Sequence, residues 1–404
     1  MSTTAMTTER AATAVPLWQR LPWWLCVLVV YALSRVLTTA VLLVGTLRQG
    51  ANPFTGARPG LLEYSVIWDG VWYRRIVESG YPTTLPVDDA GHAVTNAWAF
   101  LPGYPYVIKA LMTITTLPFD VVAVSVSVLA GAGTLLVFHR ILLRVTGSAG
   151  TALFGATLLA LNPVSLLFQV AYAESLGALL IAAGLLFALK RQYWLVLPVA
   201  VVMAFTRPGE IAFAFFLGLH ILYRLYRRRD DPFPLREFVS AAIATLAGLV
   251  AGLAWPVIAG AVTGVPSAYT DTELAWRAAA IGHTEFLPFT GWFAAGEHRA
   301  GVVGLVAVAV FMLACVAALF VPAVRRLGVD LRLWTFAYLA YLFAVFYPQS
   351  STIRLLMPVF PLIGALALPR SRVYRVAIVV VLIVVQSVWT LFVWHVTAKS
   401  PPPP

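Results

Sequence analysis

The sequence predicts an all-α protein that crosses a membrane many times as one helical bundle. Of its 404 residues, 60% are hydrophobic and 11% are charged, and the mean hydropathy is +0.85. Continuous apolar runs of about 18 residues or more recur along the chain, and an α-helix needs roughly this length to cross a bilayer. The runs lack the period-two alternation of membrane β-barrels, so we exclude that class.

Short basic loops separate the apolar runs and orient them. Lys and Arg concentrate in the cytoplasmic loops of membrane proteins, so we place the basic clusters and the N-terminus in the cytoplasm. The clusters are Arg140/Arg144, Lys190/Arg191, 224–229 with Arg236, 325–332 and 370–375. We expect about 11–12 spans. Their approximate positions are 23–46, 120–141, 147–166, 170–189, 193–206, 209–226, 237–262, 301–323, 332–348, 353–369 and 373–396.

The net charge of +11 follows from these loops. No basic face with interleaved aromatics is present, so we exclude nucleic acid as a partner. Cys26 and Cys315 lie in apolar runs and lack the spacing of a metal site or a disulfide framework.

The predicted organisation is a single integral-membrane domain over 23–397. A cytoplasmic N-terminal segment, 1–22, precedes it, and a Pro-rich tail, 398–404, follows it. Two large outer loops, 47–103 and 264–300, belong to the domain.

A short apolar segment at 104–118, which contains Lys109, does not fit the alternation of spans. As a full span it would place Arg140 and Arg144 outside. We therefore interpret it as an interfacial or re-entrant helix.

The first outer loop contains WDGVWYRRIVESGYP, residues 68–82. We predict an amphipathic interfacial helix over 69–79 that ends at Gly80. The residues expected to face the membrane are Val71, Trp72 and Ile76, and those expected to face water are Arg74, Arg75 and Glu78.

Asp69 would lie at the N-terminus of this helix, where a carboxylate interacts favourably with unpaired backbone amides. Two interpretations are open. Asp69 is an N-cap, or it is a general base that removes a proton from an acceptor hydroxyl.

Glu174 and Arg207 follow in later outer segments. Glu174 opens an apolar helix that Ser175 could cap. It either complements the helix dipole or acts as a second acid that orients Asp69, the acceptor or a metal. Arg207 lies beside Glu210, and an ion pair and a phosphate ligand are equally open.

Arg354 follows a polar turn that contains Gln349. An Arg near a helix N-terminus can bind phosphate oxygens, and a snorkelling Arg at the membrane edge is the alternative. Arg35 lies near the middle of the first span, where an Arg costs about 2.5–3.5 kcal/mol on insertion scales. We expect it to pair with a carboxylate of another helix, with a lipid phosphate as the alternative.

The second large outer loop, 264–300, receives no site assignment. Its histidines, His283 and His298, lack metal spacing. Its aromatics, including Trp276 and Trp292, either stack on sugar faces or anchor the loop at the interface.

These motifs resemble the PIG-V family of mannosyltransferases, which belongs to the GT-C superfamily. WDGVWYRRIVESGYP followed by AFLPGYP is similar to the first luminal loop of that family. AYAESLGALL and TRPGE resemble its next two patches more loosely, and QSSTIRLLMPVFPL resembles an Arg-containing late segment of bacterial relatives. The resemblance implies a GT-C-like bundle, an extracytoplasmic active site, a polyprenyl-phosphate-mannose donor, inversion at the anomeric carbon, and Asp69 as the base.

The sequence therefore predicts an inverting glycosyltransferase of the cell membrane with a lipid or glycan acceptor. The alternatives are a GT-C enzyme that uses another polyprenyl-phosphate sugar, and a transporter or flippase of lipid-linked sugars. We expect no cofactor, although Glu174 leaves a divalent metal open. The predicted catalytic residues are Asp69 and Glu174, and the predicted substrate-binding residues are Trp68, Trp72, Tyr73, Arg74, Arg75, Trp98, Tyr104, Arg207, Gln349 and Arg354.

Overall fold

The computed structural model describes residues 21–397, and the sequence predictions for 1–20 and 398–404 lie outside this range. Within it the secondary structure is helical, apart from one isolated β-bridge between Val87 and Ala93. The predicted all-α class is confirmed.

Within the described range, five helices are long and apolar enough to cross a membrane. They are α2 (Trp23–Arg48), α6 (Phe119–Thr146), α11 (Leu235–Thr263), α13 (Thr290–Ala318) and α18 (Arg372–Val393). Shorter helices complete the bundle: α7 (Ala149–Ala160), α8 (Glu174–Leu189), α9 (Tyr193–Ala204), α10 (Ala212–Tyr226) and α15 (Val329–Val345). Large apolar side chains such as Leu33, Leu246 and Val303 are exposed on the long helices, as expected for surfaces that face lipid.

Two predicted spans are interrupted. The predicted run 353–369 consists of three short pieces, α16 (Thr352–Leu355), η4 (Met357–Leu362) and α17 (Ile363–Leu366), because Pro358 and Pro361 cannot donate the helical hydrogen bonds. The run 147–166 ends as a helix at Ala160, before η2 (Ser165–Phe168). In α13 the backbone leaves helical geometry at Ala300 and Gly301, which is where the predicted span began.

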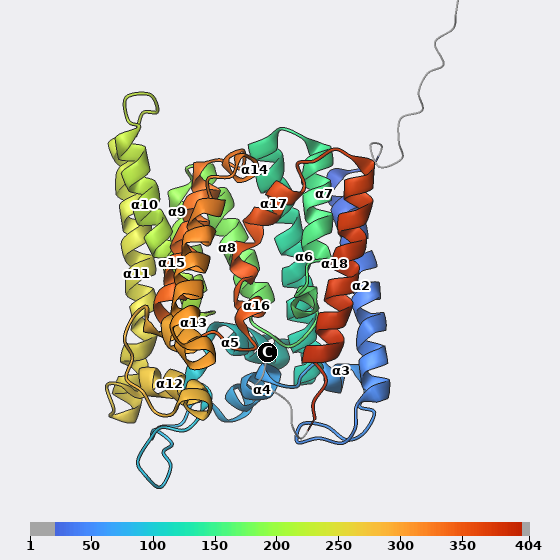
Figure 1. The fold of residues 1–404 in the computed structure, drawn as a ribbon, viewed down its shortest axis with the longest axis vertical. Helices are drawn as coiled ribbons and strands as arrows, with labels where there is room; N and C mark the ends of the chain where they lie inside the picture. Colours follow the sequence, from blue (N-terminus) through green and yellow to red (C-terminus); the bar gives the residue numbers. More distant parts are fainter. Residues whose placement is uncertain (1–20, 398–404) are drawn as a thin grey trace, which may run out of the picture.

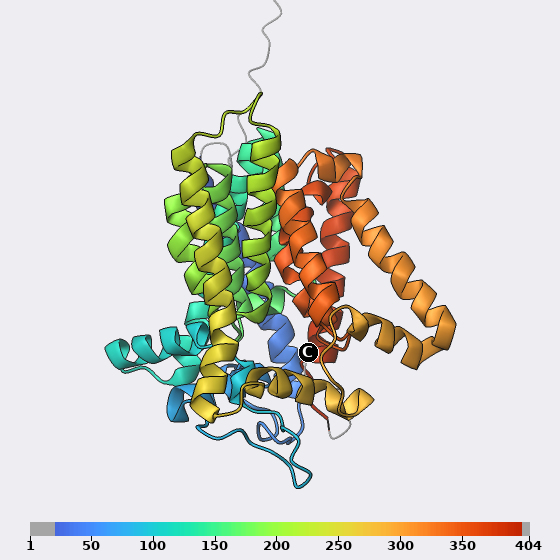
Figure 2. The same ribbon diagram turned by 90° about the vertical axis from the view of Figure 1, so that its left-hand side faces the viewer.

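The remaining short helices lie at the two ends of the bundle. At the lower end of Figure 1 lie α3 (Leu61–Tyr64), α4 (Asp69–Ser79), α5 (Gly103–Thr115) and α12 (Ala268–Ile281), and at the upper end lies α14 (Pro322–Arg325). The α10–α11 connection and the start of α18 are also at the upper end, so the predicted basic clusters gather opposite α4. Figure 2 shows the teal segment that contains α5 projecting sideways from the lower end, which agrees with the interfacial interpretation of residues 104–118.

Arg35 is buried in α2 and contacts backbone carbonyls rather than the expected carboxylate. Its guanidinium donates to the carbonyl oxygens of Ser165 (2.8 Å) and Ala160 (3.3 Å) and to the Ser165 hydroxyl. The Ala160 carbonyl lies where α7 ends, and the last carbonyls of a helix have no intrahelical donor; Ser165 is the first residue of η2. The broken helix therefore supplies the partner that a buried Arg requires.

Helix α4 has the predicted bounds, and Gly80 ends it with a φ of 75°. Arg75 and Glu78 are exposed as predicted, but Ile76, which was expected to face the membrane, is buried in the protein. The buried residues of α4 are Asp69, Gly70, Tyr73, Ile76 and Val77, because this side packs against the protein. The outward arginines lie over aromatic rings: Arg74 over Phe119 (5.3 Å) and Arg75 over Trp72 (4.8 Å).

Candidate active site

Asp69 is the first helical residue of α4, but its side chain does not cap the helix. The cap position is Trp68, whose φ of 60° places the backbone in the left-handed region, and no side-chain cap hydrogen bond is made. The backbone N–H of Asp69 donates to the Tyr172 hydroxyl (3.3 Å). The N-cap interpretation of Asp69 is therefore wrong, and the carboxylate is directed elsewhere.

The carboxylate of Asp69 belongs to a chain of four alternating charges. Nη1 of Arg354 lies 2.5 Å from Oδ2 of Asp69, and Nε of Arg354 lies 3.3 Å from Oε1 of Glu174. Arg207 forms an ion pair with the same oxygen of Glu174. The Glu174 side chain is 2% exposed, and the other three are 12–15% exposed. We call these four residues the charge cluster.

The charge cluster joins four segments that are far apart in sequence. Asp69 comes from α4, Glu174 from the start of α8, Arg207 from the turn before η3 (Pro208–Ile211), and Arg354 from α16. Arg207 pairs with Glu174. The side chain of Glu210, which the sequence suggested as its partner, lies outside the part of the chain that the structure describes. Ser175 does not cap α8, because its hydroxyl donates to the carbonyl of Leu167 (2.8 Å).

Burial raises the pKa of Asp69 above its usual range, and the guanidinium of Arg354 opposes part of that rise. A carboxylate with a raised pKa is a better proton acceptor than an exposed Asp, provided that it stays ionised. The direct contact with Arg354 favours the ionised form.

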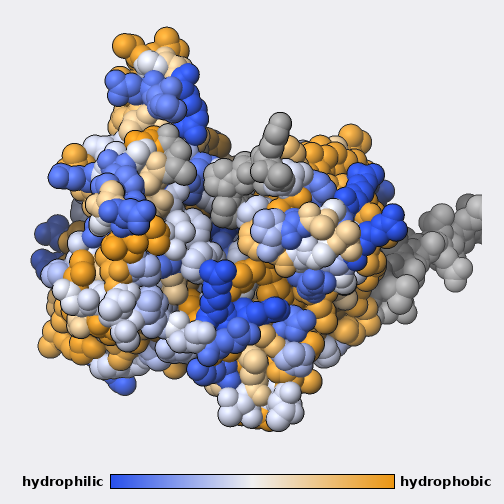
Figure 3. Space-filling view, turned by 90° about the horizontal axis from the view of Figure 1, so that it is seen from below, coloured by the Kyte–Doolittle hydropathy of each residue, from blue (hydrophilic) through white to orange (hydrophobic). Residues whose placement is uncertain are grey.

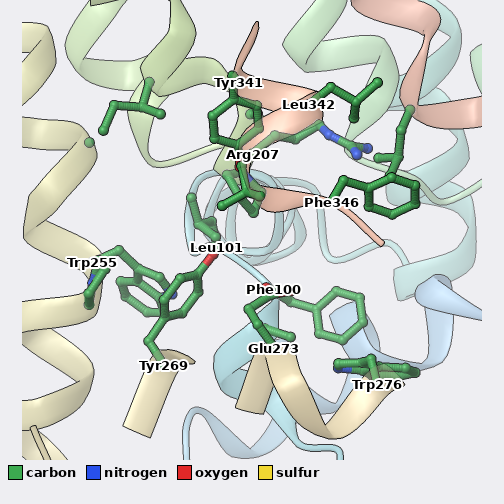
Figure 4. A pocket seen from close by; sticks show the side chains of 18 of the residues that line it. Phe100, Leu101, Arg207, Trp255, Tyr269, Glu273, Trp276, Tyr341, Leu342 and Phe346 are labelled. Atoms are coloured by element: carbon green, nitrogen blue, oxygen red, sulfur yellow. The ribbon is translucent and has the colours of Figure 1, made fainter. Parts of the chain in front are cut away.

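Three members of the charge cluster line a cavity of about 490 Å³, and Glu174 lies behind them. In Figure 4, Tyr269, Glu273 and Trp276 of α12 lie on one side of this cavity, and Tyr341 and Leu342 of α15 lie on the other. Figure 3 views the lower face of the molecule and shows hydrophilic side chains gathered around a hollow there.

One wall of the cavity is apolar and reaches the outer surface of the bundle. Leu253 of α11 lines the cavity and is 53% exposed. Ile211, Leu342 and Val345 line it as well. The cavity therefore connects the charged end of the protein to a surface that we assign to the membrane.

Glu273 is a cavity residue that the sequence analysis missed. Burial raises its pKa to about 7, against the opposing effects of a hydrogen bond from Tyr269 and the charge of Arg277. Glu273 is spaced four residues from each of these partners, so the three share one helix face. That spacing was the available signal within an outer loop without a recognisable motif.

The other predicted site residues fall into three groups. Tyr73 and Gln349 line the cavity. Trp72 stacks on the cavity residue Phe100 (5.6 Å) and meets Trp276 edge to face (5.8 Å), so it supports the wall from behind. The remaining predicted residues do not line this cavity: Trp68, Arg74, Arg75, Trp98 and Tyr104.

Trp98 and Tyr104 are core residues. Trp98 is 1% exposed, and its indole N–H donates to the carbonyl of Pro82 (3.1 Å). Tyr104 is fully buried, and its hydroxyl donates to the carbonyl of Ala123 (3.0 Å). The Trp98 bond closes the first outer loop on itself, and the Tyr104 bond links α5 to α6, so the structure gives both residues a packing role.

Comparisons with known proteins bear on the fold. The archaeal oligosaccharyltransferase AglB from Archaeoglobus fulgidus, solved with an inhibitory peptide and a dolichol-phosphate, matches with a TM-score of 0.51 at 13% identity. The match shows that the chain shares its fold with this protein. The match covers 96% of this chain and 57% of AglB, so the chain spans little more than half the length of that protein.

ArnT from Cupriavidus metallidurans, bound to undecaprenyl phosphate, also matches, with a TM-score of 0.45 at 16% identity over 84% of this chain and 60% of ArnT. No protein-family model matches the chain, and no curated protein matches it. The resemblance to the PIG-V family therefore stays a prediction.

Proposed function

We propose that the protein is an inverting glycosyltransferase that moves mannose from polyprenyl-phosphate mannose to a lipid or glycan acceptor. The observation that carries the proposal is the position of Asp69. This buried carboxylate lies in a cavity beside Arg354 and Arg207, and the same cavity opens along an apolar wall. A lipid-linked sugar donor needs a base, a cationic phosphate site and an apolar path for its tail.

The donor would lie across the cavity with each of its parts against matching chemistry. Its phosphate would meet Arg354 and Arg207, because a guanidinium has five donors and can hold a carboxylate and a phosphate together. The polyprenyl chain would follow the apolar wall formed by α11 and α15. The mannose would face the aromatic side of the cavity, where Phe100 and Trp276 can pack against a sugar ring.

The transfer step would be a single displacement. The acceptor hydroxyl oxygen attacks the anomeric carbon, and the bond from that carbon to the phosphate oxygen breaks with its electron pair on the phosphate. Asp69 takes the hydroxyl proton, and the two arginines stabilise the polyprenyl phosphate that leaves. We propose that this reaction uses no cofactor.

We propose that the enzyme lies in the cell membrane with its N-terminus in the cytoplasm and its active site outside. The support is the separation of charge along the bundle. The basic clusters lie at one end, and the charge cluster with its cavity lies at the other (Figure 1). Basic loops mark the cytoplasmic side.

The test uses purified full-length protein in detergent with labelled polyprenyl-phosphate mannose and a lipid extract as acceptor. We expect transfer by the wild type, and a loss of about 10²–10⁴-fold in Asp69→Asn, the usual contribution of a general base. Glu78→Gln is the matched control, because Glu78 is an exposed acid on the same helix. An unchanged rate in a folded Asp69→Asn protein would remove Asp69 as the base.

Parallel reactions with GDP-mannose and with other polyprenyl-phosphate sugars separate the alternatives. Transfer from a lipid-linked arabinose or glucose in place of mannose would correct the sugar and keep the reaction class. No transfer from any donor, across several extracts, would overturn the enzyme proposal and favour transport of a lipid-linked sugar.

A further inference from the structure

Outside the cavity, Asp88, His92 and His283 bring three metal-ligand side chains together. One ligand atom from each residue lies within 4.8 Å of the other two. Nδ1 of His92 is 3.6 Å from Oδ2 of Asp88, and the rings of His92 and His283 stack with their centroids 3.9 Å apart. Among the described residues, this is the group of His, Cys, Asp or Glu side chains whose ligand atoms lie close enough together to share one metal ion.

A tight turn fixes two of the three ligands. Oδ1 of Asp88 accepts hydrogen bonds from the backbone N–H groups of Ala90 (3.0 Å) and His92 (2.9 Å). The bridge between Val87 and Ala93 closes the turn.

The third ligand comes from the connection after α12. Gly282, with a φ of 74°, ends that helix and places His283 against the turn. His92 and His283 are far apart in sequence, which is why sequence spacing showed no metal motif. The sequence analysis assigned no site to the histidines of this loop, and the fold brings one of them, His283, against His92.

We propose that Asp88, His92 and His283 bind a divalent transition-metal ion, with Zn²⁺ as the best match. Two imidazoles and one carboxylate are ligands of the borderline type that Zn²⁺ takes, and three protein ligands leave a fourth position for water. Ligand atoms around a tetrahedral Zn²⁺ at about 2.0–2.2 Å are roughly 3.4 Å apart. The present separations, which reach 4.8 Å, need to close by up to about 1.4 Å, and the two stacked imidazole rings need to turn toward a common point. All three side chains are exposed, which leaves them room for this movement.

The ion would fasten the first outer loop to the end of α12. These two segments already share one buried hydrogen bond, from Nδ2 of Asn96 to Oγ1 of Thr272 (2.9 Å). Since α12 carries Tyr269, Glu273 and Trp276 into the cavity, a second link at its C-terminal end would fix this wall. Metal binding at this surface does not depend on the proposed transfer reaction.

The test is Zn²⁺ binding to tag-free full-length protein in detergent after removal of metal with a chelator. Equilibrium dialysis with elemental analysis should find one Zn²⁺ per wild-type chain. His283→Ala and Asp88→Asn should each weaken binding at least about tenfold, the smallest loss typical of a disturbed metal shell. His298→Ala is the matched control, because His298 is an exposed histidine of the following outer segment.

Hydrogen exchange gives a second measurement that does not rely on affinity. Zn²⁺ should slow amide exchange in residues 85–95 and 282–289 of the wild type and leave both segments unchanged in His283→Ala. Absence of saturable Zn²⁺ binding would overturn the proposal. So would equal binding by the wild type and His283→Ala, because the ion would then be held elsewhere.

Discussion

Arg354 donates through Nη1 to Oδ2 of Asp69 at 2.5 Å, across 285 positions of sequence. The proposed base and the proposed phosphate ligand are therefore one ion pair before any substrate arrives. The same guanidinium lies against Glu174 and over the ring of Tyr172 (5.2 Å), so its position is fixed from three sides. This pairing couples the protonation of Asp69 to the leaving-group site.

Replacement of Arg354 should change both catalysis and its pH dependence. Arg354→Gln should lower kcat/KM for the lipid-linked donor about 10²–10³-fold, as expected for a lost donor to the leaving group. Because Arg354 lowers the pKa of Asp69, its removal should move the acid limb of the pH–rate profile to higher pH. Arg354→Lys keeps the positive charge but loses the planar donor geometry, so its kcat/KM should fall between those of the wild type and Arg354→Gln. The profile of kcat/KM against pH is the measurement, and an acid limb at the wild-type position would contradict this coupling.

Glu174 and Arg207 form a buried pair whose single replacements should be costly. Glu174→Gln leaves Arg207 without its charge partner, which typically costs about 3–5 kcal/mol. The double variant Glu174→Gln/Arg207→Met should recover part of the loss in thermal unfolding, because it removes both charges.

The control is the exposed pair of Arg227 and Asp230, whose side chains are 47% and 65% exposed. Asp230→Asn should change stability by less than about 1 kcal/mol, since exposed pairs contribute little. The single variant Arg207→Met completes the comparison. If the double variant lost as much stability as Glu174→Gln and Arg207→Met lose together, the two residues would act independently.

The sequence predicted the members of the charge cluster but not their contacts. Outer loops and helix ends placed Asp69, Glu174, Arg207 and Arg354 on one side, because charge patterns report depth and side in a membrane protein. Which Arg meets which acid depends on how four helices pack, and no local pattern encodes it. The fold class could be predicted because the length of an apolar run is a local property of the sequence.

The missed features share a different cause. The run 353–369 is apolar enough for a span, and its composition outweighed Pro358 and Pro361 in the prediction. Arg35 donates to the carbonyl of Ala160, where α7 ends. The hydropathy of the sequence did not reveal that this helix ends so early. Glu273 and His283 gain their surroundings from segments far away in sequence, so each looked like an ordinary loop residue.

Gly103 is the point where the LPGYP segment docks on the turn that carries Arg207. Its backbone N–H donates to the carbonyl of Phe205 (2.7 Å), and a Cβ at this position would lie 2.7 Å from the same oxygen. Gly103→Ala must push the two segments apart, so we expect the protein to lose about 1–3 kcal/mol of stability, a cost typical of overpacking.

Gly218→Ala in α10 is the matched control, because a Cβ at that position meets nothing within 4 Å. That variant should gain about 0.5–1 kcal/mol from helix propensity. Thermal unfolding of both variants is the measurement, and equal midpoints would contradict the close contact.

Glu273 should make the stability of the protein depend on pH. Its pKa rises from 4.5 to about 7 in the fold, so the folded state prefers the protonated acid. This preference stabilises the protein fully below about pH 4.5, is lost as the pH rises to about 7, and changes no further above that value. The loss of stability between these two pH values should amount to between about 1 and 3 kcal/mol, because water in the cavity screens part of the pKa shift.

Glu273→Gln cannot ionise, so its unfolding midpoint should depend less on pH over this window. Glu297→Gln is the control, because Glu297 is an exposed acid of the next helix, and it should keep the pH dependence of the wild type. Unfolding midpoints measured from pH 4.5 to 8 decide the matter: the same slope in the wild type and Glu273→Gln would mean that the carboxyl of Glu273 ionises as freely in the fold as in water.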